Sequence, residues 1–183
     1  MGMHLNERIL IAGVGGQGVL SLGHTIAQAA ALEGRWVSWV PSYGAEMRGG
    51  VTTCTVVISD TPVLCPVVDS FGSFIALAPQ ASNLGSLVET TGLVLCDNKY
   101  SHLVRLGKDI RTVTIPAGDL GERLSLTRYI NMIFLGAYLA LQPVVSFTAV
   151  ELALKDIFGQ GEEIASVNQK ALLAGKEYIE HNA

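Results

Sequence analysis

The sequence predicts an α/β fold of three layers, with a mixed and mostly parallel sheet between helices on both faces. Residues 8–12 form a short apolar run that suits a buried strand, and Gly13, Gly15 and Gly18 follow in the order G-x-G-x-x-G. Apolar residues then recur at helical spacing through residues 19–30. Short apolar runs and helical patterns alternate along the rest of the chain, which indicates a Rossmann-like arrangement.

The other elements follow from composition and turn residues. Strands are expected where β-branched or apolar residues lie between turn residues, at residues 36–40, 51–59, 63–68, 74–78, 92–96 and 111–115. We expect residues 51–59 and 63–68 to form a hairpin, with the second strand at an edge or bulge because Pro66 interrupts it. Helices are expected at residues 79–88, 116–122, 131–141, 147–158 and 161–181.

Two of these helices are predicted in more detail. Residues 131–141 are apolar on all sides, which indicates a helix buried in the core. The helix at residues 147–158 has clear ends, with Ser146 or Thr148 as the N-cap and Gly159 just past its last turn.

Composition narrows the class of protein. We expect one domain over residues 1–183. Because 49% of its residues are hydrophobic and only 15% are charged, we also expect much of its surface to be buried between subunits. A net charge of −4 without a basic stripe argues against nucleic acid as a partner. Residues 1–7 are polar and the longest apolar stretch is too short to span a bilayer, so we expect a cytoplasmic protein without membrane contact.

The sequence assigns no catalytic residue and no metal ligand to this chain. Its cysteines, Cys54, Cys65 and Cys96, form no C-x-x-C pair, so we expect reduced and mostly buried thiols rather than a cluster or zinc site. Histidines and carboxylates show no spacing that suits a metal or an acid–base pair. The G-x-S-x-G elbow and the Walker lysine are both absent from the sequence.

The glycine loop at residues 13–18 admits three interpretations. A glycine turn before a helix N-terminus can bind phosphate, because backbone N–H groups and the helix dipole favour anions. A dinucleotide site also requires an acidic residue at the end of the second strand, where the sequence has Pro41 and Ser42 instead. The other two interpretations are close packing of strand on helix, and contact with an anion or cofactor fragment from a partner subunit.

A second glycine-bearing loop, residues 41–50, should face the same crevice because it follows the carboxyl end of the second strand. Arg48 offers a planar set of donors suited to phosphate or carboxylate, and Tyr43 offers a ring with a polar tip. Alternatively, Glu46 and Arg48 pair with neighbouring side chains and the glycines serve only the turn.

The two motifs, G-V-G-G-Q-G at residues 13–18 and Y-G-A-E-M-R-G-G at residues 43–50, are more specific together than either alone. With them the chain resembles the gamma subunit of the 2-oxoacid:ferredoxin (or acceptor) oxidoreductases, which act on pyruvate, 2-oxoglutarate, 2-oxoisovalerate or indolepyruvate. The resemblance covers essentially the whole chain, although Ala45 stands where the family usually has proline. The residues that match the family's motif positions are Gly13, Gly15, Gly16, Gln17, Gly18, Tyr43, Glu46, Arg48, Gly49 and Gly50.

The resemblance implies a subunit that is inactive alone. In such complexes a 2-oxoacid is oxidatively decarboxylated on thiamine diphosphate, iron–sulfur clusters carry electrons to ferredoxin, and coenzyme A takes the acyl group. The thiamine and cluster sites are expected in partner alpha, beta and delta subunits, because this sequence has neither a cluster motif nor G-D-G…N-N. The matched residues are expected to line the subunit junction and contact coenzyme A.

Two other functions are compatible with the sequence. One is a stand-alone nucleotide-binding Rossmann-like module, and the other is a purely structural assembly subunit. The sequence also leaves open whether the isolated chain forms a homodimer through surfaces that normally meet partners.

Overall fold

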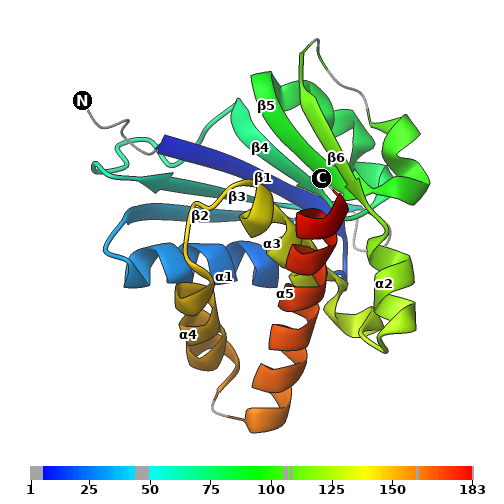
Figure 1. Ribbon diagram of the computed structural model, residues 1–183. Coiled ribbons are helices and arrows are strands. Elements are labelled where there is room, and N and C mark those ends of the chain that lie inside the picture. The colour runs from blue at the N-terminus through cyan, green and yellow to red at the C-terminus, as the bar shows by residue number, and fades with distance from the viewer. Residues whose placement is uncertain (1–5, 44–49, 105–106, 108, 160, 183) are drawn as a thin grey trace.

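The computed structural model describes residues 6–43, 50–104, 107, 109–159 and 161–182. A six-stranded sheet has the order β2-β3-β1-β4-β5-β6, as Figure 1 shows. The strands are β1 (Asn6–Val14), β2 (Trp36–Tyr43), β3 (Val51–Ser59), β4 (Phe71–Ala76), β5 (Val88–Asp97) and β6 (Arg111–Ile115). The α-helices are α1 (Val19–Leu32), α2 (Ala117–Arg123), α3 (Ile130–Leu141), α4 (Phe147–Phe158) and α5 (Glu162–Asn182).

Most strands of the sheet point in the same direction. β4, β5 and β6 continue the sheet in parallel from β1, whereas β3 is antiparallel to both β1 and β2. β2 therefore runs parallel to β1, and the carboxyl ends of β1, β2, β4, β5 and β6 share one edge of the sheet. The predicted class, a mixed and mostly parallel α/β sheet, is confirmed.

The predicted hairpin between residues 51–59 and 63–68 is wrong. β3 pairs with β2 instead, and residues 63–68 form no strand. Their valines and leucine favour a strand, but Pro62 and Pro66 lack the N–H donors that a ladder needs. β2 is also longer than predicted and includes Pro41, which an edge strand tolerates because one of its sides has no partner strand.

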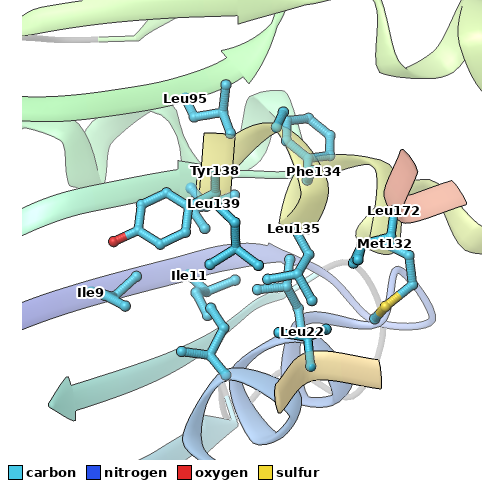
Figure 2. Close-up of a cluster of buried hydrophobic side chains, with 14 of the residues drawn as sticks. Ile9, Ile11, Leu22, Leu95, Met132, Phe134, Leu135, Tyr138, Leu139 and Leu172 are labelled. Atoms are coloured by element: carbon cyan, nitrogen blue, oxygen red, sulfur yellow. The ribbon is translucent and has the colours of Figure 1, made fainter. Parts of the chain in front are cut away.

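The long helices lie together on one face of the sheet. Figure 1 shows α1, α3, α4 and α5 below the strands, and Figure 2 shows side chains of α3 packed against Ile9 and Ile11 of β1. α3 is buried almost throughout, as its apolar sequence predicts. α4 has the predicted bounds, and the Ser146 side chain caps it by accepting a hydrogen bond from the Ala149 N–H (3.1 Å).

The opposite face is covered by shorter elements. Two 3-10 helices, η1 (Pro79–Leu87) and η2 (Asn98–Leu103), pack against a second apolar cluster that contains Leu10, Phe74 and Val94. A third 3-10 helix, η3 (Thr127–Tyr129), precedes α3. The sequence predicted a helix at residues 79–88, and the structure has a helix of the tighter 3-10 form over Pro79–Leu87. The α-helices of the sandwich are thus concentrated on one face, with 3-10 helices on the other.

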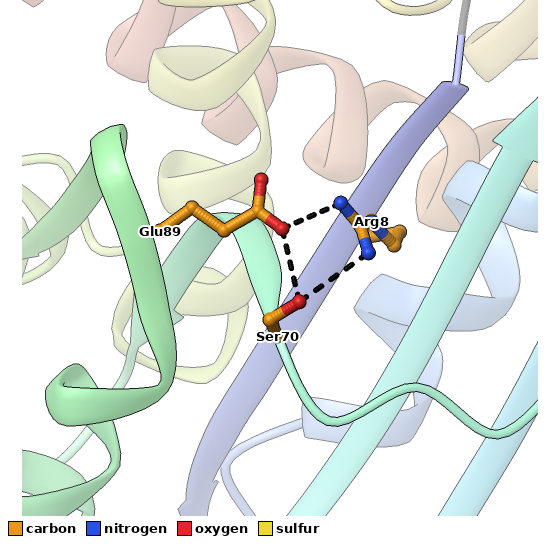
Figure 3. A network of polar contacts seen from close by, with 3 residues as sticks. All are labelled: Arg8, Ser70 and Glu89. Atoms are coloured by element: carbon orange, nitrogen blue, oxygen red, sulfur yellow. Dashed lines mark hydrogen bonds and ion pairs between the residues drawn. The ribbon is translucent and has the colours of Figure 1, made fainter.

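The amino ends of the parallel strands are joined by polar contacts. Arg8 of β1 donates to Ser70 (3.3 Å) and pairs with Glu89 of β5 (2.5 Å), and Ser70 donates to the same carboxylate (2.9 Å; Figure 3). On the helical face, the half-buried Glu7 carboxylate accepts a hydrogen bond from the Ser73 hydroxyl (2.7 Å). Burial raises the pKa of Glu7 above its ordinary value.

Two of the three thiols are buried. Cys54 and Cys96 lie inside β3 and β5, as predicted, and burial raises their pKa values to about 12 and about 11. Cys65 is exposed and lies in the segment between β3 and β4, which forms no strand. Within the described ranges, no group of histidine, cysteine, aspartate or glutamate side chains could hold a metal ion. Among the described helices, none is long and apolar enough to cross a membrane.

Candidate functional site at the glycine loop

The glycine loop occupies the turn between β1 and α1. Gly16 and Gly18 have φ values of +86° and +75°, which favour glycine because a Cβ is strained in this region. A Cβ built on Gly15 or Gly16 would meet no atom within 4 Å, so this part of the loop borders open space. Gly13 and Gly18 differ, because a Cβ on either would collide with neighbouring side chains. Gly13 and Gly18 therefore fit the packing interpretation, whereas Gly15 and Gly16 form an open turn that is accessible to a ligand.

The first turn of α1 lines a hollow beside this loop. Gly18 is the N-cap and supplies no side chain to accept from the first N–H groups, which lack partners within the helix. The first turn contains no acidic residue. Free N–H groups and the positive end of the helix dipole favour an anion there.

Two hollows flank the loop. The β3-side hollow, about 450 Å³, is lined by residues of the loop, the first turn of α1 and Thr52. The α3-side hollow, about 340 Å³, is lined by Gly16, Gln17, Leu77, Thr127, Arg128 and Ile130. Among the described residues that line the two hollows, Arg128 carries the one charged side chain, and its charge suits an anion.

The second motif begins and ends at the same edge. Val14, at the end of β1, is paired with Val51, and Tyr43, at the end of β2, is paired with Thr52. The chain thus leaves the sheet at Tyr43 and re-enters it at Val51 at the same end of the sheet as the glycine loop, and Val51 lies next to the end of β1. Gly50 precedes β3, whereas Glu46, Arg48 and Gly49 lie outside the described residues.

Gln17 lies within the loop, but its side chain turns toward the sheet. Its Oε1 accepts from the Val14 N–H (2.8 Å), and its Nε2 donates to the Leu77 carbonyl (3.2 Å). These bonds hold the turn in place. The sequence did not point to Arg128 or to Asn131 at the start of α3, because both lie more than a hundred residues away and follow no recognisable spacing.

A stand-alone dinucleotide site is not favoured by this geometry. β3 separates β1 from β2, so the end of β2 is not adjacent to the end of β1. The last residues of β2 are Pro41, Ser42 and Tyr43, none of which supplies the carboxylate that binds the ribose in dinucleotide-binding folds.

Fold and site together define an α/β domain that presents a glycine loop and a helix N-terminus at the carboxyl edge of its sheet, where β2 also ends and β3 begins. Residues 8–178 match the family described as pyruvate ferredoxin/flavodoxin oxidoreductase, and the chain belongs to this family. The family predicted from the two motifs is therefore confirmed.

Curated relatives include two kinds of subunit. Ketoisovalerate oxidoreductase subunit VorA of Methanothermobacter thermautotrophicus is 37% identical over 96% of this chain. This chain spans only 37% of the length of VorA. The 2-oxoglutarate synthase subunit KorC of the same organism is 32% identical, with 97% of each chain covered.

Solved structures share the fold. The gamma subunit of a keto/oxoacid ferredoxin oxidoreductase from Geobacter sulfurreducens aligns with a TM-score of 0.80 and 27% identity, over 96% of this chain and 99% of that chain. The 2-oxoglutarate:ferredoxin oxidoreductase from Magnetococcus marinus, solved with 2-oxoglutarate, coenzyme A and succinyl-CoA bound, aligns with a TM-score of 0.86 and 26% identity. That alignment covers 97% of this chain and 32% of the other.

Proposed function

We propose that this chain is the gamma subunit of a coenzyme A-dependent 2-oxoacid:ferredoxin oxidoreductase in the cytoplasm. Alpha, beta and delta subunits would carry thiamine diphosphate and the iron–sulfur clusters, and would pass electrons to ferredoxin. Full-length similarity to KorC and to an isolated gamma subunit supports this proposal. Because relatives named for ketoisovalerate and for 2-oxoglutarate both match this chain, we assign the choice of 2-oxoacid to the partner subunits.

The chain's own contribution would be a crevice at the subunit junction that binds part of coenzyme A. The observation that carries this proposal is the pairing of Val14 with Val51, which brings the residue that follows the second motif beside the residue that follows Gly13 in the first. The open loop at Gly15 and Gly16, the first turn of α1 and the Arg128 side chain suit the phosphates of coenzyme A. When bound, coenzyme A would supply the thiol that accepts the acyl group, and this chain would bind and orient it.

Reconstitution tests the subunit assignment. The purified chain should show no oxidation of 2-oxoacids alone and should restore turnover when it is added to the other subunits. Turnover by the isolated chain would refute the assignment.

Arg48→Ala tests the contact with coenzyme A in the assembled enzyme. Loss of one charge-assisted hydrogen bond predicts that the KM for coenzyme A rises about tenfold or more. The matched control is Arg111→Ala, because Arg111 is exposed at the amino end of β6, on the opposite edge of the sheet. An unchanged KM in Arg48→Ala would favour a purely structural subunit.

A further inference from the structure

Two amide side chains, those of Gln17 and Asn131, hold the glycine loop through hydrogen bonds to backbone atoms. Gln17 bonds to the Val14 N–H and the Leu77 carbonyl, and so joins the turn to the ends of β1 and β4. Asn131 Nδ2 at the start of α3 donates to the Gly18 carbonyl (3.3 Å), 113 residues away in the sequence. All three hydrogen bonds are made to backbone atoms, two of them in the segment from Val14 to Gly18 and one at the end of β4.

Asn131 also explains why residue 18 is glycine. Only 8% of Asn131 is exposed, and its Nδ2 would lie 2.4 Å from a Cβ at position 18. The Asn131 side chain therefore occupies the space that a side chain at the N-cap of α1 would need. A buried amide costs free energy unless it is hydrogen-bonded, and its donor here is used by the Gly18 carbonyl.

The segment that carries Asn131 also forms one wall of the site. Thr127, Arg128 and Ile130 line the α3-side hollow, and Asn131 follows them directly. A displacement of this segment would move Arg128 and the N-terminus of α1 relative to each other. The amide is also neutral, whereas a carboxylate at position 131 would place a negative charge beside the N-terminus of α1, where an anion is expected.

We propose that Asn131, together with Gln17, is a positioning residue that fixes the glycine loop and the first turn of α1 in the orientation needed to bind coenzyme A. Both side chains act in this account through the backbone of the loop and of the adjacent strand ends. The inference rests on the proposed function for its kinetic consequence, but the restraint on the loop can be measured independently.

Asn131→Ala in the assembled enzyme tests the proposal. The KM for coenzyme A should rise about fivefold to tenfold with little change in kcat, since the lost hydrogen bond to the loop is neutral. Amide hydrogen exchange at residues 14–21 should accelerate by a similar factor. Asn131→Ser, which keeps a donor, should restore part of both properties.

Asn168→Ala is the matched control. Asn168 is also buried, with 5% exposed, and its Nδ2 donates to the Ile164 carbonyl within α5 (2.9 Å). This control should lose comparable stability while both the KM for coenzyme A and the exchange of residues 14–21 stay unchanged. If Asn131→Ala behaves like Asn168→Ala, the proposal is overturned.

Gln17→Glu provides a second variant that keeps the acceptor for the Val14 N–H and removes the donor to Leu77. It should also speed exchange at residues 14–21, so the proposal stays testable if Asn131→Ala does not fold. Faster exchange with an unchanged KM in both Asn131→Ala and Arg48→Ala would keep the restraint and refute the coenzyme A contact. A raised KM in Arg48→Ala alone, with unchanged loop exchange in Asn131→Ala and Gln17→Glu, would refute the restraint on the loop and keep the coenzyme A contact.

Discussion

Replacing Gly136 with alanine should strongly destabilise the contact between α3 and α5. A Cβ at this position would lie 1.8 Å from the Leu172 carbonyl oxygen, and a Cβ on Gly175 would lie 1.9 Å from the Ile133 carbonyl oxygen. Both obstacles are backbone atoms of a neighbouring helix, so no side-chain rotation relieves the overlap. The helices would have to separate by roughly 2 Å to restore ordinary van der Waals contact.

The magnitude follows from two opposing effects. Overpacking in a dense core costs about 3 kcal/mol or more when backbone must move, whereas alanine favours a helix over glycine by about 1 kcal/mol. We therefore expect Gly136→Ala to lower the free energy of unfolding by about 2 to 3 kcal/mol. For a domain of this size, that loss corresponds to a fall in Tm of about 4 to 12 °C.

Urea unfolding followed by circular dichroism measures this loss. The matched control is Gly118→Ala in α2, where a new Cβ would lie 3.6 Å from Lys99 Nζ, an ordinary contact distance. This control should be neutral or slightly stabilised, because it gains helix propensity without a clash. Equal stability of the two variants would refute the close approach of α3 and α5.

Three further predictions follow from individual side chains. Burial raises the pKa of Glu7 above 4.5, so the folded protein loses stability as this carboxyl ionises. The free energy of unfolding of the wild type, measured by chemical denaturation, should therefore fall relative to that of Glu7→Gln as pH rises from about 4.5 toward neutrality. A difference between the two proteins that does not change with pH would contradict this. Iodoacetamide at pH 8 should modify Cys65 alone in the native protein, as judged by mass spectrometry, because the other two thiols are buried. Ser146→Ala should cost about 1 kcal/mol in urea unfolding, and Thr148→Ala much less; the reverse order would move the cap to Thr148.

Local sequence signals predicted the elements well but not all of their partners. The ends of α4 were predictable because Ser146 and Gly159 are local capping signals. The pairing of β3 was not, since propensity indicates a strand without naming its neighbour. Residues 63–68 show the limit of propensity, because their apolar side chains favour a strand while Pro66 within them and Pro62 before them lack the N–H donors of a ladder.

The residues of the candidate site also fall into those that the sequence indicated and those that only the structure identified. Its glycines were recognisable because the strand, turn and helix that form them are contiguous in the sequence. Sequence order did not indicate that Gln17 would turn inward or that Asn131 would fill the space beside Gly18, since the latter contact joins residues 113 positions apart. Long-range packing therefore decides which motif residues hold the loop and which border open space.

Hydrogen exchange of the assembled enzyme with and without coenzyme A tests the central claim most directly. A crevice formed by both motifs predicts that coenzyme A slows exchange at residues 14–21 and 43–53. Residues 60–70, at the opposite edge of the sheet, should not respond. Unchanged exchange in both loops upon saturation with coenzyme A would contradict the account.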